Sequence, residues 1–145
     1  MPALVLLDHS LLAPSPTGPA GFGAVLSGDP REQGIGLFDS DTGRFSAGVW
    51  QCTPGVVRMV RWPYNETCVL LSGRVVITPD GGEPREYRAG DAFVIPCGFT
   101  GTWDIRETVR KHYAIERPLA PLRLIVRGTR WLRRLLRRRQ AADRL

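Results

Sequence analysis

The amino-acid sequence predicts an all-β protein, with an N-terminal arm before the β domain and a short basic helix after it. Short stretches rich in Val, Ile, Thr and aromatic residues recur at nearly even spacing, as in antiparallel sandwiches and barrels. Turn residues separate these stretches, and the 16 Gly and 12 Pro suit a turn-rich β protein better than a helical one. The length of 145 residues fits a single domain with a sizeable core.

Residues 1–35 are expected to form the N-terminal arm. From residue 11 to residue 35 the chain is dense in Pro, Gly and Ser and shows no sustained hydrophobic period, which is typical of an extended arm or loop. The apolar run at the start has no basic residue before it and is too short for a signal peptide or a membrane span. We therefore expect a cytoplasmic protein.

Residues 36–118 carry the strand patterns of the β domain. The expected strands cover residues 45–49, 56–62, 67–71, 74–78, 85–87, 92–95, 101–105 and 110–115. Ser72 and Gly73 are predicted to form a tight turn between two of these strands. Strands of this number and length predict an antiparallel sandwich or barrel.

Residues 119–145 are expected to add a last strand, at 122–126, and a helix, at 129–142. The helix would place its leucines on one face and arginines around the rest. That leucine face would pack on the barrel or on a second subunit. Alternatively, the stretch from Arg127 to Arg139 would contact an anionic membrane surface or nucleic-acid phosphates.

The positive charge is confined to this tail. Eight Arg and one Asp fall within residues 127–145, so the remainder of a chain with a net charge of +6 is close to neutral. A neutral body does not suggest a nucleic-acid groove, and no specific nucleic-acid partner is predicted. The three cysteines are odd in number and lack the spacing of a metal site, which indicates reduced thiols.

Two glycine-punctuated blocks of the β domain carry a more specific signal. Their fixed positions are Pro54, Gly55, Glu66, Gly73, Gly90, Pro96 and Gly98. This spacing resembles the two signature motifs of the cupin superfamily. Over roughly residues 28–117 the sequence further resembles the cupin subgroup of ureidoglycine aminohydrolase and the ethanolamine-utilisation cupin. The segments that carry this resemblance are "AGVWQCTPG", "ETCVLLSGRVVIT", "AGDAFVIPCGFTGTW" and "VRKHYAI". The resemblance implies a double-stranded β-helix, or jelly-roll barrel, and a homodimer.

The resemblance also implies a metal held by two His and a Glu of the first motif and one His of the second. Only Glu66 matches this ligand set. The first two His positions hold Val60 and Trp62 in one register, or Met59 and Arg61 in the other, and Gly101 takes the last position. A divalent site needs three or four protein ligands, so we expect a metal-free barrel with no cofactor.

Glu66 and Lys111 are the candidate catalytic residues. Strand alternation places Glu66 and Cys68 on one face, and the cupin pattern implies that this face lines the barrel, where a carboxylate suits acid or base work. Lys111 is the only lysine of the chain, and it is a candidate anchor for a ligand or a partner for Glu66. Alternatively, Glu66 pairs with a basic residue and only fixes the barrel, and Lys111 is a solvated strand residue.

The candidate ligand-binding residues are mostly aromatic: Tyr64, Trp62, Cys68, Trp103 and Tyr113. Aromatic walls with a few polar groups are typical of small-molecule pockets, although the same rings would also serve as plain core. We therefore expect a metal-free cupin that binds a small polar metabolite. The alternatives are a metal-dependent hydrolase or isomerase related to ureidoglycine aminohydrolase, and a sensor or scaffold whose basic tail binds a membrane or nucleic acid.

Overall fold

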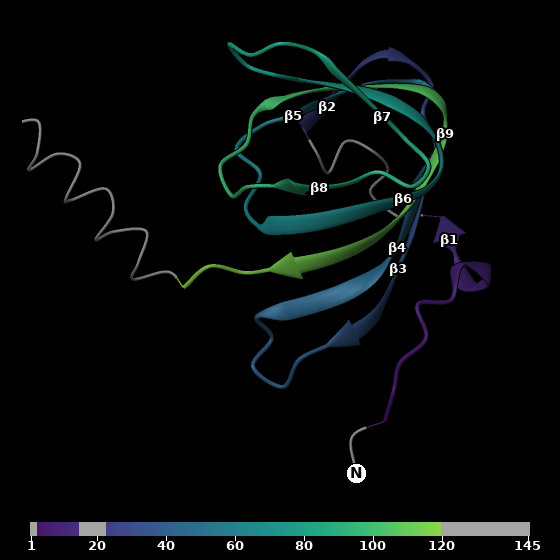
Figure 1. Ribbon diagram of the computed structural model, residues 1–145, viewed down its shortest axis with the longest axis vertical. Coiled ribbons are helices and arrows are strands. Elements are labelled where there is room, and N and C mark those ends of the chain that lie inside the picture. The colour runs from purple at the N-terminus through teal and green to yellow at the C-terminus, as the bar shows by residue number, and fades with distance from the viewer. Residues whose placement is uncertain (1–2, 15–22, 120–145) are drawn as a thin grey trace, which may run out of the picture.

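The computed structural model describes residues 3–14 and 23–119, and this part of the chain is almost entirely β (Figure 1). The elements are η1 (His9–Leu11), β1 (Ala13–Pro14), β2 (Gly23–Gly28), β3 (Glu32–Asp39), β4 (Phe45–Cys52), β5 (Gly55–Met59), β6 (Asn65–Pro79), β7 (Arg85–Arg88), β8 (Ala92–Ile95) and β9 (Gly101–Glu116). The strands curl into a barrel, which confirms the predicted jelly-roll fold. No helix in the described ranges is long and apolar enough to span a membrane. The strand and helix expected at 122–126 and 129–142 lie outside the described residues.

Two long strands, β6 and β9, belong to both sheets of the barrel. They pair with each other antiparallel along most of their length. One sheet has the order β1-β3-β4-β9-β6-β8 and uses the second half of β9 and the first half of β6. The other has the order β2-β5-β9-β6-β7 and uses the remaining halves. Because the same two strands bend from one sheet into the other, the sheets face each other across a common interior.

The tight turn predicted at Ser72 and Gly73 is wrong, because the chain continues through them as one strand. The pairing of β6 with β9 shifts register on both sides of Ser72, so the segment is a bulged bend. Gly73 has φ +87, and a Cβ there would lie 2.2 Å from the carbonyl oxygen of Thr108 in β9. Glycine is thus needed for both its backbone conformation and the close approach of β9.

The first part of the chain holds more strand than the sequence predicted. Residues 23–28 form β2, which pairs with β5, and β3 begins at Glu32 and pairs with β4. All six residues of β2 are exposed, so its side chains follow no hydrophobic alternation. Backbone pairing along the edge of a sheet leaves no such pattern, which explains why the segment resembled a loop.

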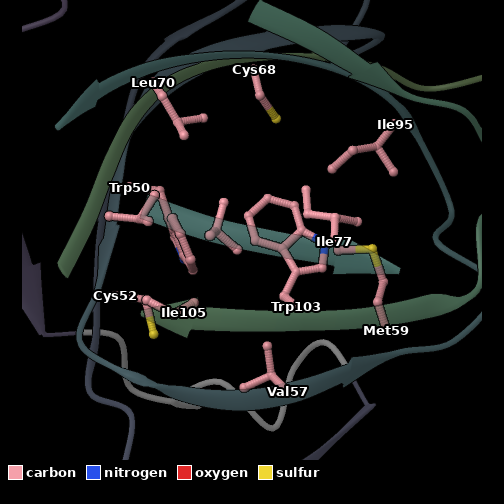
Figure 2. Close-up of a cluster of buried hydrophobic side chains, with 12 residues drawn as sticks. Trp50, Cys52, Val57, Met59, Cys68, Leu70, Ile77, Ile95, Trp103 and Ile105 are labelled. Atoms are coloured by element: carbon pink, nitrogen blue, oxygen red, sulfur yellow. The ribbon is translucent and has the colours of Figure 1, made fainter. Parts of the chain in front are cut away.

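The interior between the sheets is filled by apolar side chains from both of them (Figure 2). Trp50, Cys68 and Leu70 come from the first sheet, and Trp103 and Ile105 come from the second. All of these side chains are buried. The centre of the barrel is therefore a packed apolar core.

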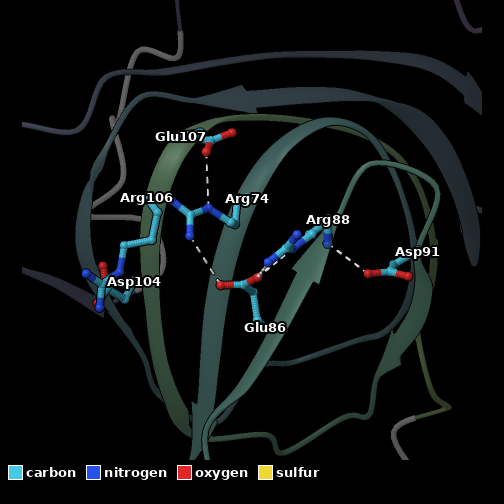
Figure 3. A network of polar contacts seen from close by, with 7 residues as sticks. All are labelled: Arg74, Glu86, Arg88, Asp91, Asp104, Arg106 and Glu107. Atoms are coloured by element: carbon cyan, nitrogen blue, oxygen red, sulfur yellow. Dashed lines mark hydrogen bonds and ion pairs between the residues drawn. The ribbon is translucent and has the colours of Figure 1, made fainter.

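A network of ion pairs fixes β7 to the outside of the barrel (Figure 3). Arg74 of β6 contacts Glu86 of β7 at 3.4 Å and Glu107 of β9 at 3.1 Å, and Glu86 also pairs with Arg88. These side chains are partly solvent-exposed, so water screens the contacts and each contributes little to stability. Their effect is to set the position of a short edge strand.

Candidate functional site: a buried ion pair at the base of a pocket

Glu66 of β6 and Lys111 of β9 form an ion pair inside the barrel. Lys111 Nζ lies 2.7 Å from Glu66 Oε1, and the two residues are only 1% and 2% exposed. The ammonium also donates a hydrogen bond to Cys68 Sγ, at 3.4 Å. Of the alternatives that the sequence left open, the structure has the pairing of Glu66 with Lys111 and not a solvated Lys111, and Glu66 and Cys68 lie on the interior face as expected.

The ammonium of Lys111 packs against two indole rings. It is 4.8 Å from the centre of the Trp50 ring and 4.9 Å from that of Trp103. Both rings attract a cation through their faces, so they replace part of the hydration that burial removes. Burial alone lowers the pKa of Lys111, but its partners Cys68 and Glu66 outweigh this effect and hold the pKa above its usual value. Burial raises the pKa of the Cys68 thiol to about 12.

A pocket of about 270 Å³ opens beside the ion pair. It is lined by Glu32, Gly34, Ile35, Gly36, Trp50, Trp62, Glu66, Lys111, Tyr113 and Ile115. Most of these residues lie on the inner face of the first sheet, at alternate positions of β3 and β9. Gly34 and Gly36 carry no side chains, and this leaves the space that the pocket occupies.

Glu32 is a second carboxylate in this pocket. Its Oε1 accepts a hydrogen bond of 2.6 Å from Trp50 Nε1. Burial raises the pKa of Glu32, although the Trp50 hydrogen bond and the charge of Lys111 act in the opposite direction. The other oxygen of Glu32 and the other oxygen of Glu66 are both buried without a hydrogen-bond partner in the described structure.

Four of the seven predicted site residues line the pocket: Glu66, Lys111, Trp62 and Tyr113. Cys68 lies behind the ion pair as a partner of Lys111. Trp103 packs in the core, where it contacts Lys111 but does not line the pocket. Tyr64 lies outside the pocket, edge-on to Trp62 with ring centres 5.4 Å apart.

Sequence reasoning missed Glu32, and it gave no pocket role to Trp50, which both packs in the core and lines the pocket. Glu32 lies in the segment that was expected to be an arm, so no strand pattern connected it to the barrel. The missing information was the pairing of β3 with β4, which sets Glu32 opposite Cys52 and Gly34 opposite Trp50. β3 and β4 are consecutive strands, but the residues around Glu32 showed no strand pattern, so the pairing could not be predicted from them.

The residues at the expected metal positions do not fit a metal. Val60 is exposed, while Trp62 presents a ring to the pocket. At Gly101 a Cβ would lie 2.5 Å from the carbonyl oxygen of Thr78 and 2.7 Å from the ring of Phe99, so no ligand side chain fits there. Glu66 is already paired with Lys111, and the described residues hold no group of three or more His, Cys, Asp or Glu suited to a metal ion. We derive no chemistry through a metal at this site.

Comparison with known proteins gives a consistent family relationship. A family model described as the EutQ-like cupin domain matches residues 39–113, just over half of the chain. A Pseudomonas syringae protein of unknown function from the DUF861 family is 28% identical, with a TM-score of 0.63 over 75% of this chain. The chain spans only 46% of that protein's length.

Two proteins described as EutQ share the fold. The Clostridium difficile EutQ protein has a TM-score of 0.59 at 16% identity, over 79% of this chain and 94% of its own. A putative ethanolamine utilization protein Q from Salmonella typhimurium has a TM-score of 0.53 at 23% identity, over 60% and 70% of the two chains. No curated protein matches the chain.

Proposed function

The chain belongs to the EutQ-like cupin domain family, and from that premise we propose that it binds a small polar metabolite in the pocket beside Glu66 and Lys111. Cupin barrels carry their sites in the interior, and this pocket opens on the interior face of the first sheet. Its lining combines aromatic and aliphatic side chains with a few polar groups, which is the composition of small-molecule sites.

One observation carries the proposal: two residues that line the pocket, Glu32 and Glu66, each have a carboxylate oxygen (Oε2) that is buried without a hydrogen-bond partner in the described structure. Burial of an ionised oxygen without a donor is costly, and native proteins rarely leave such atoms unpaired. A polar ligand in the pocket would supply the missing donors. Hydrogen bonds from the ligand would thus offset the free energy that the protein loses by burying these oxygens unpaired.

If the protein catalyses a reaction, the groups present suit proton transfer. Glu66 is held in place by Lys111, and its free oxygen is available to take or give a proton at a bound metabolite. Lys111 would then stabilise the carboxylate form of Glu66. The hydrolase alternative needs a metal, and the residues at the metal positions do not support it.

Blocking the pocket without touching its polar groups tests the proposal. A Cβ at Gly36 would make only an ordinary contact, 3.7 Å from the Tyr113 hydroxyl, so a side chain fits there without backbone strain. Gly36→Leu would fill the pocket, whereas Gly36→Ala adds one carbon and serves as the matched control. The measurement is thermal shift against a panel of small amines, alcohols, amides and carboxylic acids.

We expect at least one class of compound to stabilise the parent protein and Gly36→Ala, but not Gly36→Leu. The proposed function is wrong if no class stabilises the parent protein. It is equally wrong if Gly36→Leu responds as the parent does, because binding would then lie elsewhere.

A further inference from the structure

We propose that the ligand carries a protonated amine, whose N–H groups bind Glu32 Oε2 and Glu66 Oε2. This inference rests on the proposed function and names the chemical class of the ligand. It follows from which polar atoms in the pocket are already in use, from the charge of the site and from its walls.

The carboxylate oxygens left for a ligand, Glu32 Oε2 and Glu66 Oε2, are acceptors. The strongest donor, Lys111 Nζ, already donates to Glu66 and Cys68. Trp50 Nε1 already donates to Glu32. The hydroxyl of Tyr113 lies 3.5 Å from the carbonyl oxygen of Ile35 and donates to it. The two free carboxylate oxygens accept hydrogen bonds only, so a ligand that satisfies them must be a donor.

The charge of the site favours a cation. Glu32 and Glu66 carry two negative charges when ionised, and Lys111 carries one positive charge. The charges of Asp39 and Arg117 act on the pKa of Tyr113 in opposite directions. A ligand with one positive charge would neutralise the remaining negative charge, whereas a carboxylate ligand would add to it. Burial raises the pKa of Glu32, and neither the Trp50 hydrogen bond nor the charge of Lys111 fully offsets that effect.

The residues that line the pocket, and its volume, further restrict the chemical class of the ligand. Trp50, Trp62 and Tyr113 present aromatic surface, which attracts an ammonium and packs well against short alkyl chains. The volume of about 270 Å³ is below the usual range for drug-sized ligands, so the metabolite is small. A divalent metal would find too few ligands here, and the ammonium of Lys111 would repel it.

The test compares three probes with the same three-carbon skeleton: propylamine, 1-propanol and propionate. Binding is followed at neutral pH by the NMR resonance of the Trp50 indole N–H, which bonds to Glu32 and so reports on the pocket directly. We expect propylamine to shift this resonance in a saturable way and to bind at least tenfold more tightly than 1-propanol. Propionate is expected to leave the resonance unchanged.

Glu32→Gln keeps the size of the side chain and an oxygen for Trp50 but removes the charge. We expect it to weaken propylamine binding at least tenfold. Glu83→Gln is the matched control, because Glu83 lies outside this pocket, and it should bind as the parent protein does. Gly36→Leu supplies a second variant, with every polar group intact, and should abolish the shift.

Preferential binding of propionate or 1-propanol would overturn the amine inference while leaving the proposed function intact. Propylamine binding that Glu32→Gln and Gly36→Leu both leave unchanged would also overturn it. If no probe and no member of the wider panel binds, both the inference and the proposed function fail.

Discussion

Lys111 shows how one residue type can be required by its surroundings. The chain carries nineteen Arg and this one Lys. The position lies between Glu66 and two indole rings, and it is 1% exposed. A compact ammonium on an unbranched stem fits there, whereas the wide, planar guanidinium of Arg would need more donors satisfied and more room. The rarity of Lys elsewhere therefore makes this position the most informative basic residue in the chain.

Breaking the Glu66–Lys111 pair from either side should destabilise the fold strongly. Glu66→Gln and Lys111→Met each leave one buried charge without its partner, which costs about 3–5 kcal/mol in comparable pairs. The double variant removes both charges, so we expect it to lose much less than the sum of the two single losses. Urea unfolding of the four proteins measures this coupling.

A surface pair provides the control for that cycle. Arg58 and Asp80 form an ion pair of 2.6 Å outside the barrel, and the Asp80 side chain is 53% exposed. Asp80→Asn should change the unfolding midpoint far less than either buried substitution. Strict additivity of Glu66→Gln and Lys111→Met would contradict the coupling that the geometry implies.

At the residue scale, the sequence singled out Glu66 and Lys111, with their pairing as one alternative, but it found only part of the pocket. Glu66 was found because cupin motifs fix its position, and Lys111 because it is unique. Glu32 could not be found, since its role depends on the pairing of β3 with β4 across the intervening loop. The interior placement of Trp103 could not be separated from a wall position either, because both place the ring on the same face of a strand.

The bends in β6 and β9 are the features that make two sheets from one set of strands. Gly73 lies at the bend of β6, where a Cβ would clash with the backbone of Thr108. A glycine with positive φ also fits a tight turn, so the local sequence around Gly73 is the same for a hairpin and a bulge. Only the partner strand decides between them, and that partner lies more than thirty residues away.

Gly73→Ala should therefore destabilise the protein more than the same change at a free turn. Gly81 is the matched control, because it also has a positive φ, +71, but nothing lies within 4 Å of a Cβ placed there. Backbone strain at positive φ should destabilise both variants by about 1–3 kcal/mol, and only Gly73→Ala adds the clash with β9. Urea unfolding should give a clearly lower midpoint for Gly73→Ala than for Gly81→Ala. Equal midpoints would mean that β9 can move away from the bend at little cost.

The molecule as a whole should lose stability in alkali. Burial raises the pKa of Cys52 and of Cys68 to about 12, from 9.0 for an ordinary thiol. Below pH 9 both thiols are protonated in the folded and the unfolded chain. Between pH 9 and pH 12 the unfolded chain releases protons that the folded chain keeps, so the free energy of unfolding falls by about 1.4 kcal/mol per pH unit for each thiol.

Urea unfolding between pH 8 and pH 11 measures this loss. The variant Cys52→Ala/Cys68→Ala should show a shallower fall above pH 9. The raised pKa of Lys111 leaves a remaining fall at higher pH, because the unfolded chain loses that proton first. Parallel curves for the two proteins would show that the thiols are not the groups responsible.

The charge distribution predicts how the whole chain behaves at an anionic surface. Removal of residues 127–145 takes away eight Arg and one Asp, which changes the net charge from +6 to −1. We expect the full chain to bind vesicles containing phosphatidylserine at low salt, and the shortened chain not to bind. Flotation with vesicles is the measurement, and neutral phosphatidylcholine vesicles are the control. Equal binding by both chains would place the contact on the barrel.

Because both sheets share β9, the barrel cannot fold completely during synthesis on the ribosome until β9 has been made. The strand pairs β2–β5, β3–β4, β6–β7 and β6–β8 consist of segments made before β9, but neither sheet can be completed until Gly101–Glu116 has been synthesised. Until then Glu66 has no Lys111 to pair with, and the inner faces of these strand pairs stay open to water and to chaperones. We therefore expect the barrel to close only after β9 has been synthesised, so that the pocket and the core form at the same time.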